Sequence, residues 1–179
     1  MAKDIKTYYE QSYIENTLRL REVLQTLPSF TKDYFRAVEP TTSAKTRISY
    51  AYDIRVFFHF LIENNPIYHD YTTTQFTLQD LERVEPIDIE EYLEYLKVYK
   101  ADDNQVITNG EKGLARKFSS LRSFYRYFYR HQMIEKNPTI FVDMPKLHDK
   151  AIIRLDIDEV ALLLDYVENC GKELTGQKK

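Results

Sequence analysis

Nearly every apolar-rich segment of this chain repeats its apolar residues at intervals of three and four. This spacing places apolar side chains on one face of an α-helix, whereas a half-buried strand needs a period of two. The clearest case lies in residues 111–133, where one stripe is formed by Leu114, Phe118, Leu121, Tyr125 and Phe128. The sequence therefore predicts an all-α protein in which this helix is buried along one side.

The same reasoning predicts shorter and longer helices over residues 4–24, 30–38, 43–63, 78–83, 87–99 and 160–167. Thr42 or Ser43 can cap the long helix that ends near Glu63, and Pro86 suits a first helical turn. Residues 67–77 are expected to form a loop or an extended connection, and residues 101–109 a flexible polar loop. Residues 144–150 are predicted to be an extended basic linker, and residues 171–179 a polar tail.

Composition limits the function. The 179 residues contain four Gly and one cysteine, Cys170, which cannot form an internal disulfide. No stretch approaches the roughly 20 apolar residues of a membrane span, so we expect a soluble, cytoplasmic protein. The glycines form no phosphate-binding loop and the four histidines show no zinc-binding spacing. We therefore expect no catalytic site, cofactor, metal or small-molecule ligand.

The charge of the chain is distributed unevenly. The net charge of −3 argues against a nucleic-acid-binding protein. Residues 112–150, however, contain nine basic and three acidic residues, so the rest of the chain is strongly acidic. Such asymmetry is typical of a polyanion-binding surface on a protein of modest net charge.

The helix over residues 111–133 carries no acid opposite its apolar stripe; that face holds Lys112, Arg116, Ser119, Ser120, Ser123, Arg126, Tyr127 and Arg130. Basic and hydroxyl side chains together suit a phosphate backbone. The predicted DNA contacts are Lys112, Arg116, Lys117, Ser120, Ser123, Arg126 and Arg130, with a second patch at Lys45, Thr46 and Ser49. Because Arg116 is opposite the stripe, Arg116→Glu is expected to weaken binding without unfolding the protein. The alternatives are a solvated basic face and a helical module that binds an acidic protein partner.

Two segments resemble a known family. Residues 46–61 (TRISYAYDIRVFFHFL) resemble the first core-binding helix of phage integrases and related tyrosine recombinases, with Thr46, Tyr50 and Asp53 at the typical spacing. Residues 114–128, followed by Asn137-Pro138 and Pro145-Lys146, are similar to the family's last core-binding helix and the segment that leads from it to the catalytic domain.

The resemblance implies a SAM-like orthogonal helical bundle that forms one half of a clamp around double-stranded DNA. It implies three parts: a helical N-terminal extension (1–40), a core-binding domain (41–148), and a linker with the first helix of a truncated catalytic domain (149–179). The family's catalytic Arg, Lys, His-x-x-Arg, His and Tyr belong to that last domain, and no His here is followed three residues later by Arg. This fragment is thus expected to bind DNA without cutting or joining it, while the parent is a strand-transferring recombinase that assembles with itself on DNA.

Overall fold

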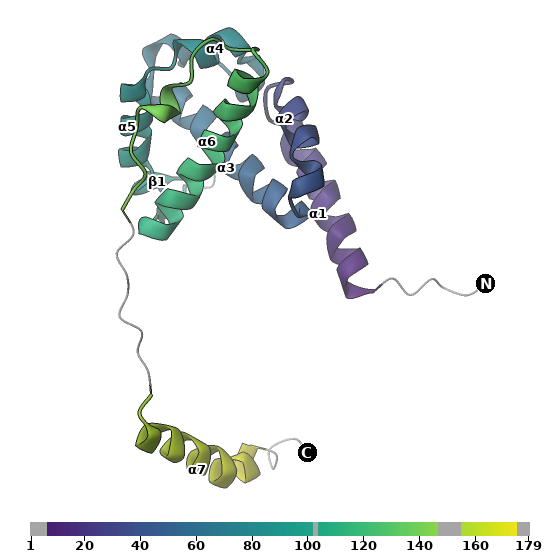
Figure 1. The fold of residues 1–179 in the computed structure, drawn as a ribbon, viewed down its shortest axis with the longest axis vertical. Helices are drawn as coiled ribbons and strands as arrows, with labels where there is room; N and C mark the ends of the chain where they lie inside the picture. Colours follow the sequence, from purple (N-terminus) through teal and green to yellow (C-terminus); the bar gives the residue numbers. More distant parts are fainter. Residues whose placement is uncertain (1–6, 102–103, 147–154, 175–179) are drawn as a thin grey trace, which may run out of the picture. The chain divides into compact units, whose positions relative to one another are not determined.

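The computed structural model describes residues 7–101, 104–146 and 155–174 (Figure 1). It divides into two compact units, residues 1–147 and residues 148–179.

The first unit is built from helices, which confirms the all-α, SAM-like prediction. Its α-helices are α1 (Tyr8–Gln25), α2 (Thr31–Ala37), α3 (Ala44–Asn64), α4 (Leu78–Arg83), α5 (Pro86–Tyr95) and α6 (Glu111–Arg130). The described part of this unit also contains four 3-10 turns: η1 (Glu39–Thr41), η2 (Pro66–Tyr68), η3 (Thr73–Gln75) and, after α6, η4 (Pro138–Ile140). The strands β1 (Val98–Lys100) and β2 (Val106–Thr108) form a small antiparallel hairpin, with Val98 opposite Thr108.

Local capping explains where the helices begin. The Ser43 hydroxyl accepts a hydrogen bond from the Thr46 amide at 3.1 Å, as predicted for the start of α3. Pro86 occupies the first turn of α5, and the Asp88 carboxylate accepts from the Glu85 amide at 2.7 Å. These caps satisfy amide groups that a helix leaves without intrahelical partners.

Helix α3 lies at the centre of the first unit, between α1, α5 and α6 (Figure 1). Tyr52 of α3 accepts a hydrogen bond from Arg19 of α1 at 2.8 Å. On another side, Phe60 is buried against Tyr92 and Tyr95. Neighbouring helices therefore cover α3 on more than one side.

Aromatic rings form much of the core, and Phe124 of α6 lies in their middle. Its ring centroid lies 5.0 to 6.4 Å from those of its aromatic neighbours Phe30, Tyr34, Phe58, Tyr125 and Phe128. Most of these pairs meet edge to face, the arrangement that ring quadrupoles favour. Phe30 and Tyr34 anchor the N-terminal segment on α6, so α1 and α2 belong to the same compact unit as α3–α6.

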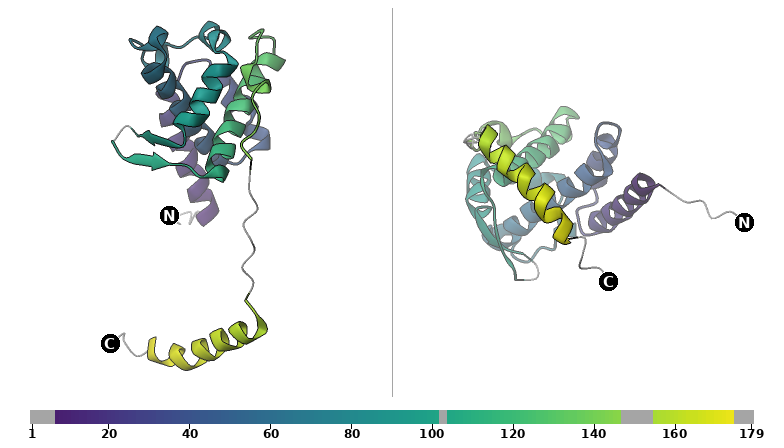
Figure 2. Two further views of the ribbon diagram at one scale, coloured as in Figure 1. Left: turned by 90° about the vertical axis from the view of Figure 1, so that its left-hand side faces the viewer. Right: turned by 90° about the horizontal axis from the view of Figure 1, so that it is seen from below.

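The hairpin corrects two predictions. The helix predicted over residues 87–99 ends at Tyr95, and the predicted loop over 101–109 contains β2 (Figure 2). Tyr99 is buried in β1 and stacks on Tyr95 with centroids 5.3 Å apart. This stacking and the pairing with β2 outweigh continuation of α5. Helix α6 also stops at Arg130, short of the predicted end at residue 133, and Gln132 takes a left-handed conformation with φ of 55°.

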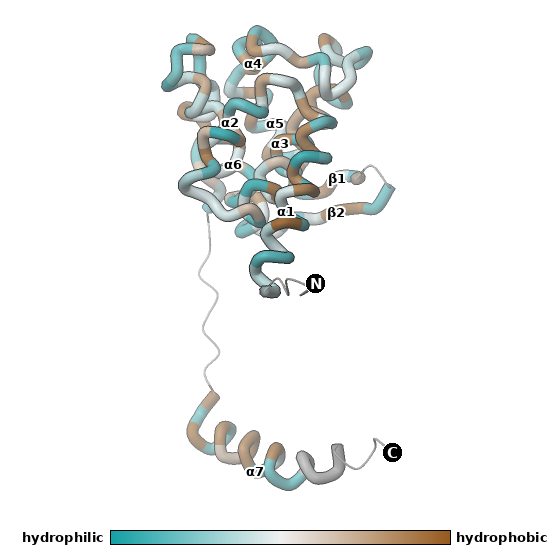
Figure 3. Tube along the Cα trace, turned by 90° about the vertical axis from the view of Figure 1, so that its right-hand side faces the viewer, coloured by the Kyte–Doolittle hydropathy of each residue, from teal (hydrophilic) through white to brown (hydrophobic). Residues whose placement is uncertain are grey.

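The second unit contains α7 (Ile157–Leu174), which extends beyond the predicted range of residues 160–167. Residues 171–174, predicted to belong to a polar tail, lie in this helix. Hydrophobic residues recur along it (Figure 3), and Ile157, Val160, Leu164 and Val167 fall on one face and are exposed. Parts of four predictions lie outside the described residues: 4–6 of the first helix, 102–103 of the polar loop, 147–150 of the linker and 175–179 of the tail.

Candidate nucleic-acid interface

A basic groove runs along the outer face of α6. It encloses about 610 Å³ and is lined by Ser119, Arg122, Ser123, Arg126, Tyr129, Arg130, Asn137, Ile140 and Met144. One wall is the helix, and the other is the segment that returns past it after the chain leaves α6. We call this hollow the basic groove.

The amphipathic pattern of α6 explains why the arginines point into the groove. Phe118, Leu121, Tyr125 and Phe128 are buried as the stripe predicts. Arg126 and Arg130 lie on the opposite side and are exposed. Burial of the stripe fixes the rotation of α6 about its axis and thereby turns the arginines outward.

In the described parts of the chain, the arginines of the groove carry positive charge that no neighbouring acid neutralises. Within the parts of the chain that the structure describes, neither Arg122, Arg126 nor Arg130 has a carboxylate within 4.0 Å. The three follow one another at four-residue intervals, which corresponds to about 6 Å along a helix axis. Such a row of guanidinium groups can bind several phosphates, each through two parallel hydrogen bonds.

Two predicted contacts, Lys117 and Ser120, are buried instead of exposed. The Lys117 ammonium lies 3.1 Å from the Asp53 carboxylate of α3, and the Ser120 hydroxyl donates to the Lys117 carbonyl at 2.8 Å. The signal was present in the sequence, because Lys117 comes three residues after Leu114 and four before Leu121. It therefore lies on the apolar stripe itself, where a cation needs a buried counter-ion.

Arg116 lies at the edge of the interface, and a buried side chain, Asp53, binds its guanidinium. Its guanidinium donates to both Asp53 carboxylate oxygens, at 2.6 and 2.9 Å, while 49% of its side chain is exposed. A glutamate here would face the buried carboxylate, so the expectation that Arg116→Glu leaves the fold intact does not hold. The exposed part of Arg116 still adds to the basic surface.

Ser123 is half-buried and accepts a hydrogen bond from the Tyr34 hydroxyl at 3.1 Å. Burial raises the pKa of Tyr34 to about 12, although its hydrogen bond with Ser123 acts in the opposite direction. Tyr34 is therefore neutral and acts as the donor, which leaves the Ser123 proton free to point into the groove. Lys112 is exposed on the first turn of α6, and Tyr127 packs against Tyr34.

The second predicted patch has fewer side chains available to bind DNA than expected. Lys45 is exposed, but Thr46 and Ser49 are half-buried. The Ser49 hydroxyl donates to the Lys45 carbonyl at 3.1 Å, and the Thr46 hydroxyl lies 2.9 Å from that of Ser43. Both hydroxyls thus have local partners, and Lys45 supplies the charge of this patch.

Sequence reasoning missed Arg122 and the second wall of the groove. Arg122 lies four residues before Arg126, which is a signal for the same helix face. Its guanidinium lies 5.6 Å from the ring centroid of Phe118. Asn137, Ile140 and Met144 could not be predicted, because no local pattern indicates that this segment turns back along α6.

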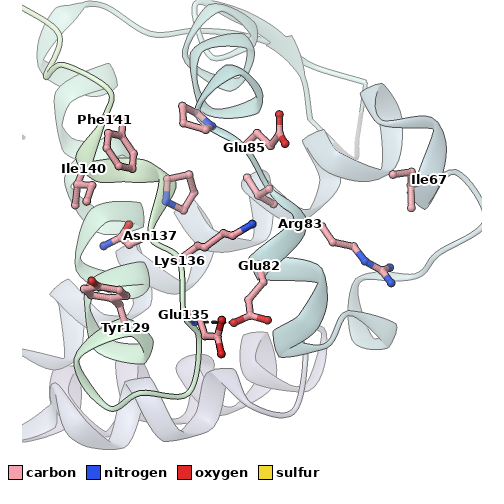
Figure 4. A pocket seen from close by; sticks show the side chains of 13 residues that line it. Ile67, Glu82, Arg83, Glu85, Tyr129, Glu135, Lys136, Asn137, Ile140 and Phe141 are labelled. Carbon is pink, nitrogen blue, oxygen red and sulfur yellow. Dashed lines mark hydrogen bonds between the residues drawn. The ribbon is translucent and has the colours of Figure 1, made fainter.

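A larger cavity of about 820 Å³ lies on the other side of this segment (Figure 4). It shares Tyr129, Asn137 and Ile140 with the basic groove, but none of the predicted contacts lines it. Its charged rim is mixed and includes Glu82, whose carboxylate accepts from the Glu135 amide at 2.6 Å. The cavity therefore lacks the uniform positive charge that a polyanion needs.

No group of three or more His, Cys, Asp or Glu side chains in residues 7–101, 104–146 and 155–174 is arranged to hold a metal ion. Over the same part of the chain, no helix has the length and apolar character needed to cross a membrane.

Comparisons with known proteins place residues 30–132 in a family model described as "Phage integrase, N-terminal SAM-like domain". The tyrosine recombinase XerC of Caldanaerobacter subterraneus is 32% identical over 145 residues, which cover 79% of this chain and 40% of the relative. XerC of Leptospira interrogans is 25% identical and covers 77% of this chain and 38% of the relative. A tyrosine recombinase of Pseudothermotoga lettingae is 32% identical, and the match covers 69% of this chain and 37% of the relative. The chain thus spans about two fifths of the length of these relatives, and no solved structure matches it significantly.

Proposed function

The chain belongs to the phage integrase family through its N-terminal SAM-like domain, and we propose that its first compact unit binds double-stranded DNA as the core-binding half of a site-specific recombinase. The observation that supports this most is the row Arg122, Arg126 and Arg130, which has no acidic partner in the described structure. A protein that keeps such a row on one face is suited to a polyanionic ligand.

The proposed interface consists of five basic side chains on α6. They are Lys112, Arg116, Arg122, Arg126 and Arg130, with Lys45 beyond them on α3. Ser119 and Ser123 add hydroxyl donors between the arginines. The guanidinium groups can bind phosphates and, where α6 enters the major groove, the O6 and N7 atoms of guanine. Beneath this surface, Lys117 connects α6 to α3 through Asp53, and Ser120 is buried in the same helix.

The rest of the proposal concerns the full-length protein and is based on the relatives, which are named tyrosine recombinases. The parent protein is a tyrosine-type recombinase whose strand cleavage and joining take place outside residues 1–148. In this proposal the first unit clamps one side of the recombination site, and residues 149–179 lead into the catalytic domain with α7 as its first helix. Copies of the full-length protein assemble on DNA.

The experiment is a fluorescence-anisotropy titration of the chain with a labelled duplex at low salt. Arg126→Glu is expected to reduce affinity at least about tenfold, because a charge-assisted contact is replaced by repulsion. The matched control is Arg21→Glu, which changes an exposed arginine on α1 that does not line the basic groove. Equal losses for the two variants, or no binding by the unaltered chain, contradict the proposal. Equal affinity for heparin and duplex favours an acidic protein partner instead.

A further inference from the structure

Asp53 has an unusual position for an acid in a protein that binds a polyanion. It is 2% exposed, and its carboxylate receives three hydrogen bonds from α6, two from Arg116 and one from Lys117. A buried carboxylate is costly unless it is paired and hydrogen-bonded. Here it is bound by two cations, so the cluster keeps a net charge of about +1.

The surplus charge reaches the surface through Arg116. The Lys117 side chain is buried, with 9% exposure, whereas Arg116 is about half exposed. Arg116 uses one N–H of each terminal nitrogen on Asp53, at 2.6 and 2.9 Å. A guanidinium has five N–H donors in a planar fork, so three donors remain for a ligand, and their directions are fixed by the carboxylate beneath.

We propose that Asp53 is a positioning residue, which holds the Arg116 guanidinium at the α6 surface with its remaining donors facing a DNA phosphate. This inference rests on the proposed function. A free arginine loses side-chain entropy when it binds, but Arg116 is already ordered by the bidentate pair. The Asp53 carboxylate therefore promotes binding of a polyanion although its own charge repels one.

The direction in which Asp53→Asn changes duplex affinity distinguishes positioning of Arg116 from a purely electrostatic effect. Asp53→Asn removes a negative charge, and long-range attraction alone should then strengthen duplex binding. If Asp53 positions Arg116, the variant binds about tenfold more weakly, because the phosphate contact loses its geometry. The slope of log affinity against log salt also becomes shallower by about 0.9 for one lost phosphate contact. The matched control is Asp80→Asn, since Asp80 is a buried, ion-paired acid on α4, and it should bind as well as or better than the unaltered chain.

Two substitutions of Arg116 extend the test. In an Arg116→Ala background, Asp53→Asn should cause no further loss of affinity, because both changes remove one interaction. Arg116→Lys keeps the charge but loses the fork that spans both carboxylate oxygens. It should bind about tenfold more weakly than the unaltered chain, and it keeps the proposal falsifiable if Asp53→Asn does not fold. Helical circular dichroism establishes folding for each variant at the temperature of the titration.

The outcomes separate the two proposals. If the unaltered chain binds no duplex at low salt, the proposed function and the role of Asp53 both fail. If the chain binds duplex and Arg126→Glu weakens it, while Asp53→Asn and Arg116→Lys bind as tightly as the unaltered chain, only the role of Asp53 is overturned. Weaker binding by both Asp53→Asn and Arg116→Lys, with Asp80→Asn unaffected, supports it.

Discussion

Arg116 and Lys117 are adjacent in sequence but differ in what they offer a ligand. Both bind Asp53, yet Arg116 keeps an exposed guanidinium while the Lys117 ammonium is enclosed. The difference follows from the 100° step between neighbouring helical residues, which places Lys117 on the apolar side. The Asp53–Arg116 pair spans 63 positions, so no local pattern could have predicted it.

Lys117→Met tests whether Lys117 is structural. The substitution keeps the length of the side chain and leaves Arg116 on Asp53. We expect the free energy of unfolding in urea to fall by about 1–3 kcal/mol, because one charge-assisted hydrogen bond to a buried carboxylate is lost. Lys112→Met, on the exposed first turn of the same helix, should leave stability unchanged within about 0.5 kcal/mol. Unchanged stability of Lys117→Met, together with lost duplex affinity, is incompatible with its buried position.

At the scale of the elements, helical spacing predicted most of the fold. Helix α4 has the predicted bounds, and α3 begins at the predicted cap. The hairpin was missed because each strand has only three residues and is stabilised by Tyr99 stacking on Tyr95, which is a tertiary contact. Local periodicity thus predicts α6 and its basic face, but not the segment that makes this face a groove.

Helix α1 provides a test of how far the folded unit extends beyond the family match. Leu20 is buried in the core, whereas Tyr9, on the first turns of the same helix, is 83% exposed. Leu20→Ala is expected to reduce the free energy of unfolding by about 2–5 kcal/mol, since it leaves a cavity. Tyr9→Ala should change it by less than about 0.5 kcal/mol. Equal effects of the two variants in urea denaturation would show that α1 does not pack on α3 as described.

For the whole molecule, four buried tyrosines make stability depend on alkaline pH. Burial raises the pKa of Tyr34 and Tyr68 to about 12, and it raises the pKa of Tyr92 and Tyr125 well above the usual value. The unfolded chain releases these protons near pH 10, whereas the native state retains them. Their contribution to stability is therefore complete below about pH 10 and is lost as the pH rises toward about 12.

For each of these tyrosines, the free energy of unfolding should fall by up to about 1.4 kcal/mol for every unit by which the pH rises in this window. Urea denaturation at a series of pH values, followed by the helical circular dichroism signal, measures the decline. A stability that stays constant across the window would mean that the four hydroxyls ionise freely in the native state.

The net charge of −3 conceals a surface on which five basic side chains of α6 gather. The sequence predicted four of them, and the structure replaces Lys117 with Arg122. The most direct test of this surface is the salt dependence of duplex binding by the unaltered chain. Five phosphate contacts predict a slope of log affinity against log salt of about −4.5. A slope near zero, or no binding to any duplex at low salt, would contradict the assignment of this face to DNA.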